Sequence, residues 1–470
     1  MTSTRKKTAA AIGSQKAAEI AVTALEPAQW KAFSETLGPS ARVAAALAGF
    51  SGDARQVVLL GDDEGRLARV LFGVGDDPKA EMFRDLAGRL PAGAYRLEQT
   101  PKGLTGEAVA VAFALGAYRF DRYRKATPSP QLAPPAGADA AEIVHIAHAL
   151  NLARDMINTG ANDMGPLQVE TIAREIAEAH GARIDVTIGE ALLETGYPAV
   201  HTVGRAAAPH RAPRMIEISW AGPGAGATAP LVALVGKGVV FDSGGLDIKP
   251  TAGMRQMKKD MGGAAHALAL GRMIMAAGLP IRLAVLIPAV ENAISGDAMR
   301  PGDVIASRKG LSIEVGNTDA EGRLILADAL TRAAELAPDL TIDLATLTGA
   351  ARVALGPDLP PFYTDDDRLA DEILAASTAT DDPVWRMPLW RGYDAAIDSD
   401  VADVTNEPDA WAQAGSITAA LFLRRFAPSG GAWVHFDIFA WNPRNRPGWP
   451  KGAEVQAIRA LYALLRKRYA

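Results

Sequence analysis

The chain has 470 residues, an apolar fraction of 49% and a formal net charge of −5 at pH 7. This length predicts two or three domains, and the apolar content is sufficient for large cores. It contains no cysteine, which excludes disulfides, thiolate nucleophiles and cysteine-ligated zinc and fits a reducing, cytoplasmic location. The negative net charge argues against nucleic acid as a partner. The sequence has no run of 18 apolar residues, so no membrane span is predicted.

Residues 1–128 are predicted to form a smaller N-terminal α/β domain with a mobile basic tail at its start. The segments 54–61 and 68–75 alternate as paired strands around the turn DDEGR. Residues 79–90 have helical spacing, and 107–118 form a further apolar segment. No group of catalytic residue types occurs in this part of the chain.

Residues 129–152 are predicted to be a linker followed by a connecting helix. The stretch 127–140, TPSPQLAPPAGADA, is rich in proline and alanine. The helix begins near Ala141 and carries His145 and His148 three residues apart. These histidines could share a metal, but an ordinary helix face is favoured because no acidic partner is placed nearby.

Residues 153–470 are predicted to form a larger catalytic domain, because strand and helix patterns alternate along it. The predicted strands are 231–236, 281–292, 340–349 and 432–438, and the predicted helices are 261–278, 324–337 and 453–468. This alternation predicts an α/β fold with a mainly parallel central sheet covered by helices on both faces. Charged motifs follow the strand ends, where ligands bind in such sheets.

Two glycine-rich stretches concentrate the charged residues of this domain. They are 235–265, VGKGVVFDSGGLDIKPTAGMRQMKKDMGGAA, and 317–324, NTDAEGRL. Together they carry four carboxylates, two lysines and an arginine: Asp242, Asp260, Asp319, Glu321, Lys237, Lys249 and Arg323. Crowded carboxylates must be protonated or shared with cations, and four negative charges balance two divalent ions. Asp319 and Glu321 are two residues apart, so on extended backbone they are predicted to face one site.

These motifs resemble those of the leucyl aminopeptidase (cytosol aminopeptidase) family of two-metal exopeptidases. The family octapeptide NTDAEGRL is unbroken at 317–324. The resemblance runs from about Arg154 to the C-terminus and includes ENAISGDAMRPGDV, DLATLTGA, WRMPLW and GSITAALFLRRF.

The resemblance implies a metal-dependent aminopeptidase that hydrolyses the N-terminal residue from peptides by a metal-activated water. It implies that Asp242 and Glu321 bridge two divalent ions, that Asp319 binds one, and that Asp260 and Lys237 bind the other. It further implies that Lys249 stabilises the oxyanion and that Arg323 holds a bicarbonate as general base. The oxygen-rich ligands suit manganese or magnesium, but zinc also binds such sites, so the metal stays open.

The same resemblance places substrate-binding residues at Met257, Asn317, Thr346, Leu347 and Gly349. The sequence departs from the family pattern at 435–443, HFDIFAWNP, and in the loop 406–415, NEPDAWAQAG. In the family, a small residue at the position of Phe439 helps to form the pocket for the side chain of the substrate's first residue. With phenylalanine there, this pocket is predicted to be shallower than in the usual family member. The alternative is that the ring fills the core below and leaves the pocket unchanged.

Two other functions stay open on the sequence. Another two-metal hydrolase, such as a phosphoesterase, would use the same carboxylates. Some relatives of the family bind DNA, and a weak basic cluster occurs at 446–452, although the acidic net charge counts against this role. The expected partners are peptides with a free N-terminus and further copies of the chain, as a homohexamer.

Overall fold

The computed structural model describes residues 12–13, 20–408 and 413–470. These residues divide into two compact units, one formed by the described residues up to 151 with 442–452 and the other by those between 152 and 441 with 453–470. The return of residues 442–452 to the first unit has no counterpart in the predicted domain scheme. The predicted mobile tail lies almost wholly outside the described residues.

The first unit is built on a five-stranded sheet with the strand order β2-β3-β1-β4-β5. Its strands are β1 (Ile20–Leu25), β2 (Val57–Gly61), β3 (Leu67–Gly73), β4 (Gly93–Leu97) and β5 (Pro130–Leu132), and its helices include α2 (Pro27–Thr36), α3 (Pro39–Leu47), α4 (Glu81–Arg89) and α5 (Gly106–Ala117). The antiparallel pairing of β2 with β3 confirms the predicted hairpin. Strand β5 pairs with β4 inside the stretch predicted as a linker, so that stretch is partly structured.

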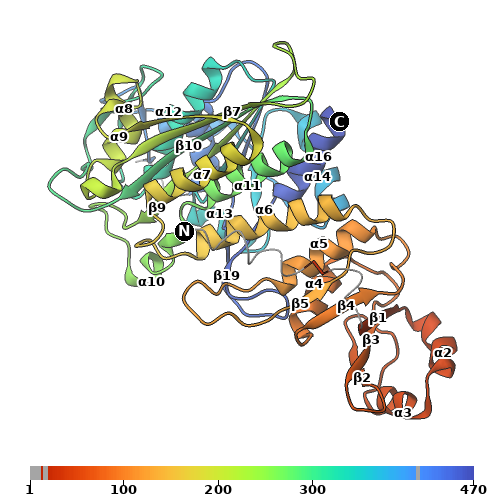
Figure 1. Cartoon of the computed structure of the whole chain (residues 1–470). Coiled ribbons are helices and arrows are strands. Elements are labelled where there is room, and N and C mark those ends of the chain that lie inside the picture. Colours follow the sequence, from red (N-terminus) through yellow and green to blue (C-terminus); the bar gives the residue numbers. More distant parts are fainter. Residues whose placement is uncertain (1–11, 14–19, 409–412) are drawn as a thin grey trace. The chain divides into compact units, whose positions relative to one another are not determined.

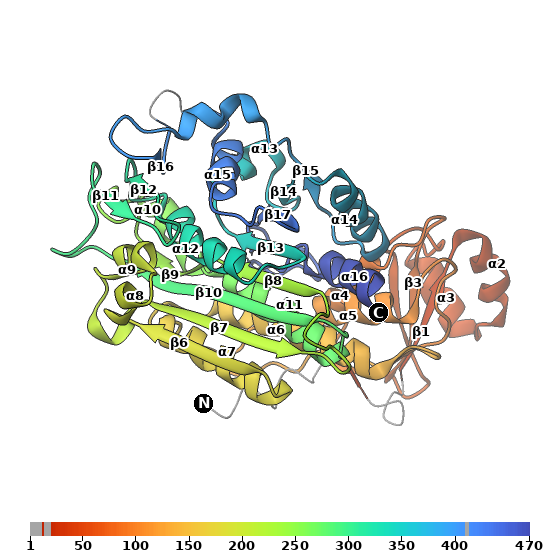
Figure 2. The same ribbon diagram turned by 90° about the horizontal axis from the view of Figure 1, so that it is seen from above.

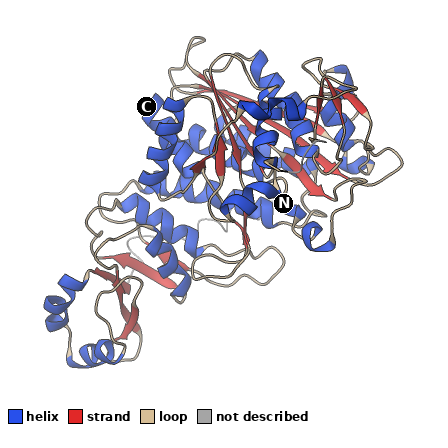
Figure 3. Cartoon of the chain, turned by 180° about the vertical axis from the view of Figure 1, so that it is seen from behind, coloured by secondary structure: helices blue, strands red, loops and turns tan. Residues whose placement is uncertain are grey.

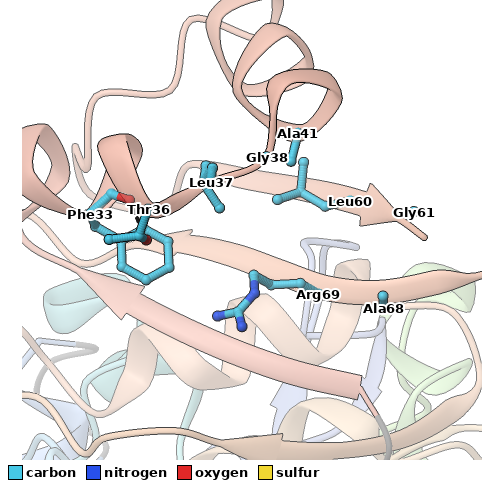
Figure 4. A pocket seen from close by; sticks show the side chains of 9 residues that line it. All are labelled: Phe33, Thr36, Leu37, Gly38, Ala41, Leu60, Gly61, Ala68 and Arg69. Carbon is cyan, nitrogen blue, oxygen red and sulfur yellow. Dashed lines mark hydrogen bonds between the residues drawn. The ribbon is translucent and has the colours of Figure 1, made fainter. Parts of the chain in front are cut away.

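A hollow in the first unit lies between the helices α2 and α3 and the strands β2 and β3 (Figure 4). Phe33, Leu37 and Leu60 supply apolar parts of its lining. Arg69 is its charged residue, and its guanidinium lies 2.6 Å from the Glu98 carboxylate. This hollow therefore contains a satisfied ion pair and no group of catalytic side chains.

The second unit is built on a nine-stranded sheet. Its strands are β6 (Arg183–Ile188), β7 (Arg214–Ala221), β8 (Leu231–Gly236), β9 (Gly238–Asp242), β10 (Arg282–Asn292), β13 (Leu340–Ala345), β14 (Pro361–Tyr363), β15 (Trp385–Arg386) and β17 (Ala432–Asp437). The order is β15-β14-β17-β13-β8-β10-β7-β6, with β9 paired to β10 (Figure 2). The central strands β17, β13, β8 and β10 are parallel, which confirms the predicted mainly parallel sheet.

Helices cover both faces of this sheet. The helices of the unit and of the segment leading into it are α6 (Ala140–Asn158), α7 (Pro166–His180), α8 (Ala191–Glu194), α9 (Pro198–Gly204), α10 (Thr251–Met254), α11 (Gly262–Ala277), α12 (Glu321–Glu335), α13 (Gly349–Leu355), α14 (Asp367–Thr380), α15 (Gly415–Arg424) and α16 (Ile458–Tyr469). Helices α7 and α11 contact each other and one face, whereas α9 and α12 pack together on the other (Figure 1). Figure 3 shows the strands in red between these helices in blue.

Sequence composition explains this layering. Strand β8 is apolar throughout and fully buried, as expected for a strand covered on both faces. Helix α11 is buried along most of its length, and Gly236 of β8 lets its backbone approach Ala264 closely. Short strands complete the structure, namely β11 (Val304–Ala306), β12 (Ser312–Glu314), β16 (Val404–Thr405), β18 (Trp441–Asn442) and β19 (Gly452–Ala453). Within the described ranges no helix combines the length and apolarity needed to span a membrane.

Candidate active site

The charged residues predicted from sequence lie at junctions between secondary-structure elements. Lys237 sits between β8 and β9, and Asp242 is the last residue of β9. Asp260 follows the short 3-10 turn η4 (Met257–Lys259), directly before α11. Glu321 is the first residue of α12. Because β8, β10 and β13 are parallel neighbours, the segments that follow them meet at one edge of the sheet.

Two lysines connect four carboxylates into one cluster. The Nζ atom of Lys237 lies 2.7 Å from Asp260 Oδ2 and 2.9 Å from Glu321 Oε1. The Nζ atom of Lys249 lies 2.7 Å from Asp242 Oδ2 and also pairs with Asp319. These contacts involve six of the seven charged residues that the sequence singled out, and Arg323 is the seventh.

The local geometry of Asp319 and Glu321 differs from the predicted extended backbone. The N–H of Asp319 donates to Asn317 Oδ1 at 2.7 Å, which forms a tight turn, and α12 begins at Glu321. The prediction of an extended segment is therefore wrong. The two side chains still converge, because the turn and the first helical residue bring both carboxylates to the same edge. Oxygens of Asp242, Asp319 and Glu321 lie within 4.8 Å of one another.

Crowding and burial shift the protonation of two of these carboxylates. Burial raises the pKa of Glu321 to about 8, and the negative charge of Asp242 adds to this effect. Burial and Asp242 likewise raise the pKa of Asp319 to about 6. Without a cation beside them, the carboxyl groups of Asp319 and Glu321 therefore bind protons near neutral pH. A divalent cation would relieve the same repulsion.

Lysines dominate the other side of the cluster. Burial by itself would raise the pKa of Asp260, but Lys237 and Lys259 outweigh burial and hold this pKa at about 2. Burial opposes the charge of Lys237, yet Asp260 and Glu321 raise its pKa above the usual range. The side chains of Lys237 and Asp260 are each only 3% exposed, so this pair is well shielded from water.

The unsatisfied oxygens of the cluster fit a metal site. Glu321 is 1% exposed, and neither its Oε2 atom nor its Oε1 atom has a hydrogen-bond partner among the described residues. Lys237 is the ion-pair partner of Oε1. A buried carboxylate oxygen without a partner is costly unless a cation coordinates it. The donor set of carboxylate oxygens therefore fits divalent cations.

Glycine at two positions makes this crowding sterically feasible. Gly244 has φ +88°, and a Cβ atom there would come within 2.3 Å of the Asp247 carbonyl and 3.0 Å of Asp319 Oδ1. A Cβ atom at Gly322 would lie 2.6 Å from Lys237 Cε. Any side chain at these positions would push the charged groups apart.

Two neutral side chains, those of Asn292 and Thr346, donate hydrogen bonds to carboxylates of the cluster. No role for Asn292 was predicted from the sequence. Asn292 Nδ2 donates to Asp242 Oδ1 at 2.8 Å and to the Thr318 carbonyl at 3.1 Å. Thr346 Oγ1 donates to Asp260 Oδ1 at 2.8 Å. The signal for Asn292 was present, because this residue lies in the motif ENAISGDAMRPGDV.

Arg323 lies near the cluster on the first turn of α12. Its guanidinium is buried, which lowers its pKa, while Glu407 and Glu321 oppose this effect. One edge donates from Nη1 to the Asn406 carbonyl. The Nε atom is buried and has no hydrogen-bond partner in the described part of the chain. This free edge could receive a small planar oxyanion.

The predicted substrate-binding residues come from four separate segments. Met257 is buried in η4, and Asn317 forms the turn before α12. Leu347 follows β13 and donates its N–H to Asp437 Oδ1 at 3.0 Å, while Gly349 opens α13. Thr346 lies beside Leu347 and contacts Asp260 as described above. Of the divergent loop 406–415, residues 409–412 lie outside the described residues.

Phe439 follows β17 and is half-buried. Two cationic side chains flank its ring, with Lys259 Nζ at 5.5 Å and Arg352 Cζ at 4.6 Å from the ring centroid. Neither cation was predicted from the sequence. The pair Lys258–Lys259 before Asp260 was a signal for the first, whereas nothing local linked Arg352 to Phe439.

The two histidines of the connecting helix are not part of this cluster. His145 and His148 both lie on α6, as predicted. Where the structure describes side chains, the group with metal-ligand spacing is the one formed by Asp242, Asp319 and Glu321.

Comparison with known proteins assigns the chain to a family. The model of the cytosol aminopeptidase family, catalytic domain, matches residues 151–462, and that of the M17 aminopeptidase N-terminal domain matches residues 20–134. The chain therefore belongs to the cytosol aminopeptidase family, which confirms the resemblance found in the sequence.

Individual relatives agree with this assignment. The cytosol aminopeptidase of Coxiella burnetii is 43% identical, with a TM-score of 0.91 over 98% of this chain and 99% of that one. The bottromycin maturation enzyme BotP, solved in complex with Mn, is 34% identical, with a TM-score of 0.86 over 96% of this chain and 100% of that one. A probable cytosol aminopeptidase of Chlorobium limicola is 44% identical over 318 residues, which are 67% of this chain and 62% of that protein. The matched region thus spans about three fifths of that curated relative's length.

Proposed function

We propose that this protein is a metal-dependent aminopeptidase that removes the N-terminal residue from peptides. The observation that carries the proposal is the buried carboxylate cluster around Glu321, whose Oε2 atom lacks a partner among the described residues. Family membership supports the same reaction. Two bound divalent ions would supply an activated water and polarise the scissile carbonyl.

The proposed ligands divide between two metal positions. Asp242 and Glu321 would serve both positions, Asp319 would help to hold one ion, and Asp260 with Lys237 would help to hold the other. The contacts of Lys237 with Asp260 and Glu321 support the placement of its Nζ beside the second position. Nearby divalent charge would favour the neutral amine of Lys237, in contrast to the effect of the carboxylates alone.

Lys249 is proposed to stabilise the oxyanion that develops on the carbonyl. Its side chain is 13% exposed, compared with 3% for Lys237, so it is the more accessible of the two lysines. The carboxylates of Asp242 and Glu321 raise its pKa against the opposing effect of burial, and this keeps it charged. A charged donor at this position stabilises negative charge in the transition state.

Arg323 is proposed to hold a bicarbonate that accepts a proton from the attacking water. Its unpartnered Nε atom supports this role, since a guanidinium edge matches a planar oxyanion. Asn317, Thr346 and Leu347 would lie around the same space, with Met257, Gly349 and Phe439 toward the first side chain of the substrate.

The metal, location and assembly are proposed from relatives. Manganese is the first candidate because it is bound in the related BotP structure, with zinc and magnesium as alternatives. A cytoplasmic location is supported by the name of the relatives, cytosol aminopeptidase. A homohexamer is expected from the family resemblance, and light scattering would measure it.

Hydrolysis of a panel of aminoacyl amides tests the proposal. The protein is first treated with chelator and then supplied with Mn²⁺, Zn²⁺ or Mg²⁺. We expect no turnover after chelation and recovery with at least one metal. Turnover of a phosphoester, without turnover of any aminoacyl amide, would identify a phosphoesterase instead. Salt-dependent retention on DNA without hydrolysis would identify the non-enzymatic role.

A further inference from the structure

Two cationic side chains, the buried Lys259 and the half-buried Arg352, meet at the half-buried ring of Phe439. Arg352 and Lys259 both face the Phe439 ring. The carboxylate that pairs with this group is that of Asp260, 3.5 Å from Lys259 Nζ, and Asp260 also pairs with Lys237. Within the described ranges, no carboxylate lies within 4.0 Å of the Arg352 guanidinium.

The guanidinium of Arg352 is held in place on two sides. Its Nη1 atom donates to the Thr348 carbonyl at 2.9 Å, and its Cζ atom lies over the Phe439 ring, 4.6 Å from the ring centroid. Stacking on an aromatic face orients a guanidinium without using its in-plane N–H donors. Most of the five donors of Arg352 therefore stay available for a ligand.

The Nη2 atom of Arg352 lies beside Gly349, the first residue of the same helix α13. A Cβ atom built on Gly349 would lie 3.6 Å from Arg352 Nη2, so this atom lies beside a residue that has no side chain to cover it. Gly349 and Phe439 are both among the proposed substrate-binding residues. Lys259 then links this corner to Asp260, a proposed metal ligand.

We propose that Arg352 is a specificity-determining residue that binds a carboxylate of the peptide substrate through its guanidinium fork. This inference rests on the proposed aminopeptidase function and deepens it by naming a substrate class. The carboxylate has two sources with the same chemistry. It belongs either to an acidic first residue or to the free C-terminus of a very short peptide.

Matched substrate pairs separate the two sources. The first pair is glutamyl amide and glutaminyl amide, which differ in charge but hardly in shape. The second pair is leucyl-glycine with a free carboxylate and leucyl-glycine amide. On each pair, kcat/KM is measured for the metal-loaded wild-type protein, Arg352→Met, Arg352→Lys and the control Arg368→Met. Arg368 is exposed on α14 and pairs with Glu372.

We expect the wild-type protein to favour the charged member of one pair by about 10- to 100-fold, the usual range for a hydrogen bond to a charged group. Arg352→Met should abolish this preference, Arg352→Lys should restore part of it, and Arg368→Met should keep it. A preference in the first pair assigns the acidic side chain, and a preference in the second assigns the C-terminus.

Turnover without a charge preference in either pair would overturn this inference and leave the aminopeptidase function standing. An equal loss on both members of each pair in Arg352→Met would also overturn it, because Arg352 would then only support the fold. Absence of turnover on every peptide substrate with every metal would overturn both proposals.

Discussion

The two units of this protein treat buried charge differently. In the described part of the first unit, the buried charged residues are Arg84 and Asp85. Arg84 donates to the Gly448 carbonyl at 2.8 Å and lies over the Trp449 ring, and Asp85 pairs with Arg89 at 2.8 Å. Each charge thus has a nearby partner of its own, although burial still raises the pKa of Asp85.

In the second unit, one group of buried charges crowds together instead. The buried charged residues of its site include Lys237, Asp242, Lys259, Asp260, Glu321 and Arg323. Their pKa values move in opposite directions, and several of their polar atoms lack hydrogen-bond partners among the described residues. Stability alone does not favour such an arrangement, so the contrast marks a functional site.

The largest expected effect comes from Glu321→Gln, which removes a charge from the crowded cluster. We expect kcat/KM to fall at least about a thousandfold, since metal ions contribute several kcal/mol to transition-state stabilisation. Circular dichroism should show a folded protein. Glu335→Gln, at the other end of the same helix α12, is the matched control and should keep activity. Near-normal activity of Glu321→Gln would remove this residue from the site.

Lys249→Met should have the next largest effect. We expect kcat to fall by about 10²- to 10³-fold, as for loss of one oxyanion donor, while metal content stays unchanged. Steady-state kinetics and elemental analysis measure the two quantities. Lys309→Met, at an exposed lysine outside the cluster, is the control. Loss of bound metal in Lys249→Met would make this lysine structural instead.

Phe439→Ala decides whether the ring shapes the pocket. If it does, kcat/KM for bulky first residues should rise relative to alanine by at most about 10- to 200-fold. If the ring only fills the core, the order of preference stays the same and the free energy of unfolding falls, by up to about 3–5 kcal/mol. A substrate panel and chemical unfolding distinguish these results.

The smallest expected effect concerns His266, a buried histidine of α11. Its Nε2 atom accepts from the Gln456 N–H at 3.0 Å, which leaves the proton on Nδ1 to donate to the Gly262 carbonyl. Burial lowers its pKa to about 4. The unfolded state, with a pKa near 6.5, therefore binds the proton more tightly, and stability falls as pH drops from about 6.5 to 4.

Denaturant unfolding measures this effect. Between pH 7.5 and pH 5, His266 should account for a loss of about 2 kcal/mol in the free energy of unfolding. This pH-dependent part should vanish in His266→Leu and persist in His210→Gln, where the histidine is exposed. An identical pH dependence in wild type and His266→Leu would refute the assignment.

Strongly periodic segments made much of the fold predictable from sequence. The apolar run of β8 and the helical pattern of α11 were found because burial on all sides leaves a continuous apolar signal. Strand β5 was missed because it is short and rich in proline neighbours, which resemble a linker. Its pairing with β4 is a long-range contact that local sequence does not encode.

In the candidate site, too, features encoded locally were predictable from sequence and long-range contacts were not. Motif spacing identified the carboxylates and lysines, because each motif is continuous in the chain. The turn before Glu321 was not foreseen, since two residues at spacing two fit both a strand and a turn. The convergence of Lys259, Arg352 and Phe439 was also unpredictable. These residues come from three segments that are distant in sequence and meet only in the folded protein.

The central claim is that the carboxylate cluster binds two divalent ions that catalysis requires, and counting metal ions tests it most directly. Wild type, Asp260→Ala and Glu321→Ala are loaded with Mn²⁺, dialysed, and assayed for manganese per chain and for leucyl amide hydrolysis. The account predicts two ions per active wild-type chain, fewer in both variants, and activity that falls with metal content. Full activity in a wild-type protein that retains no metal would contradict it.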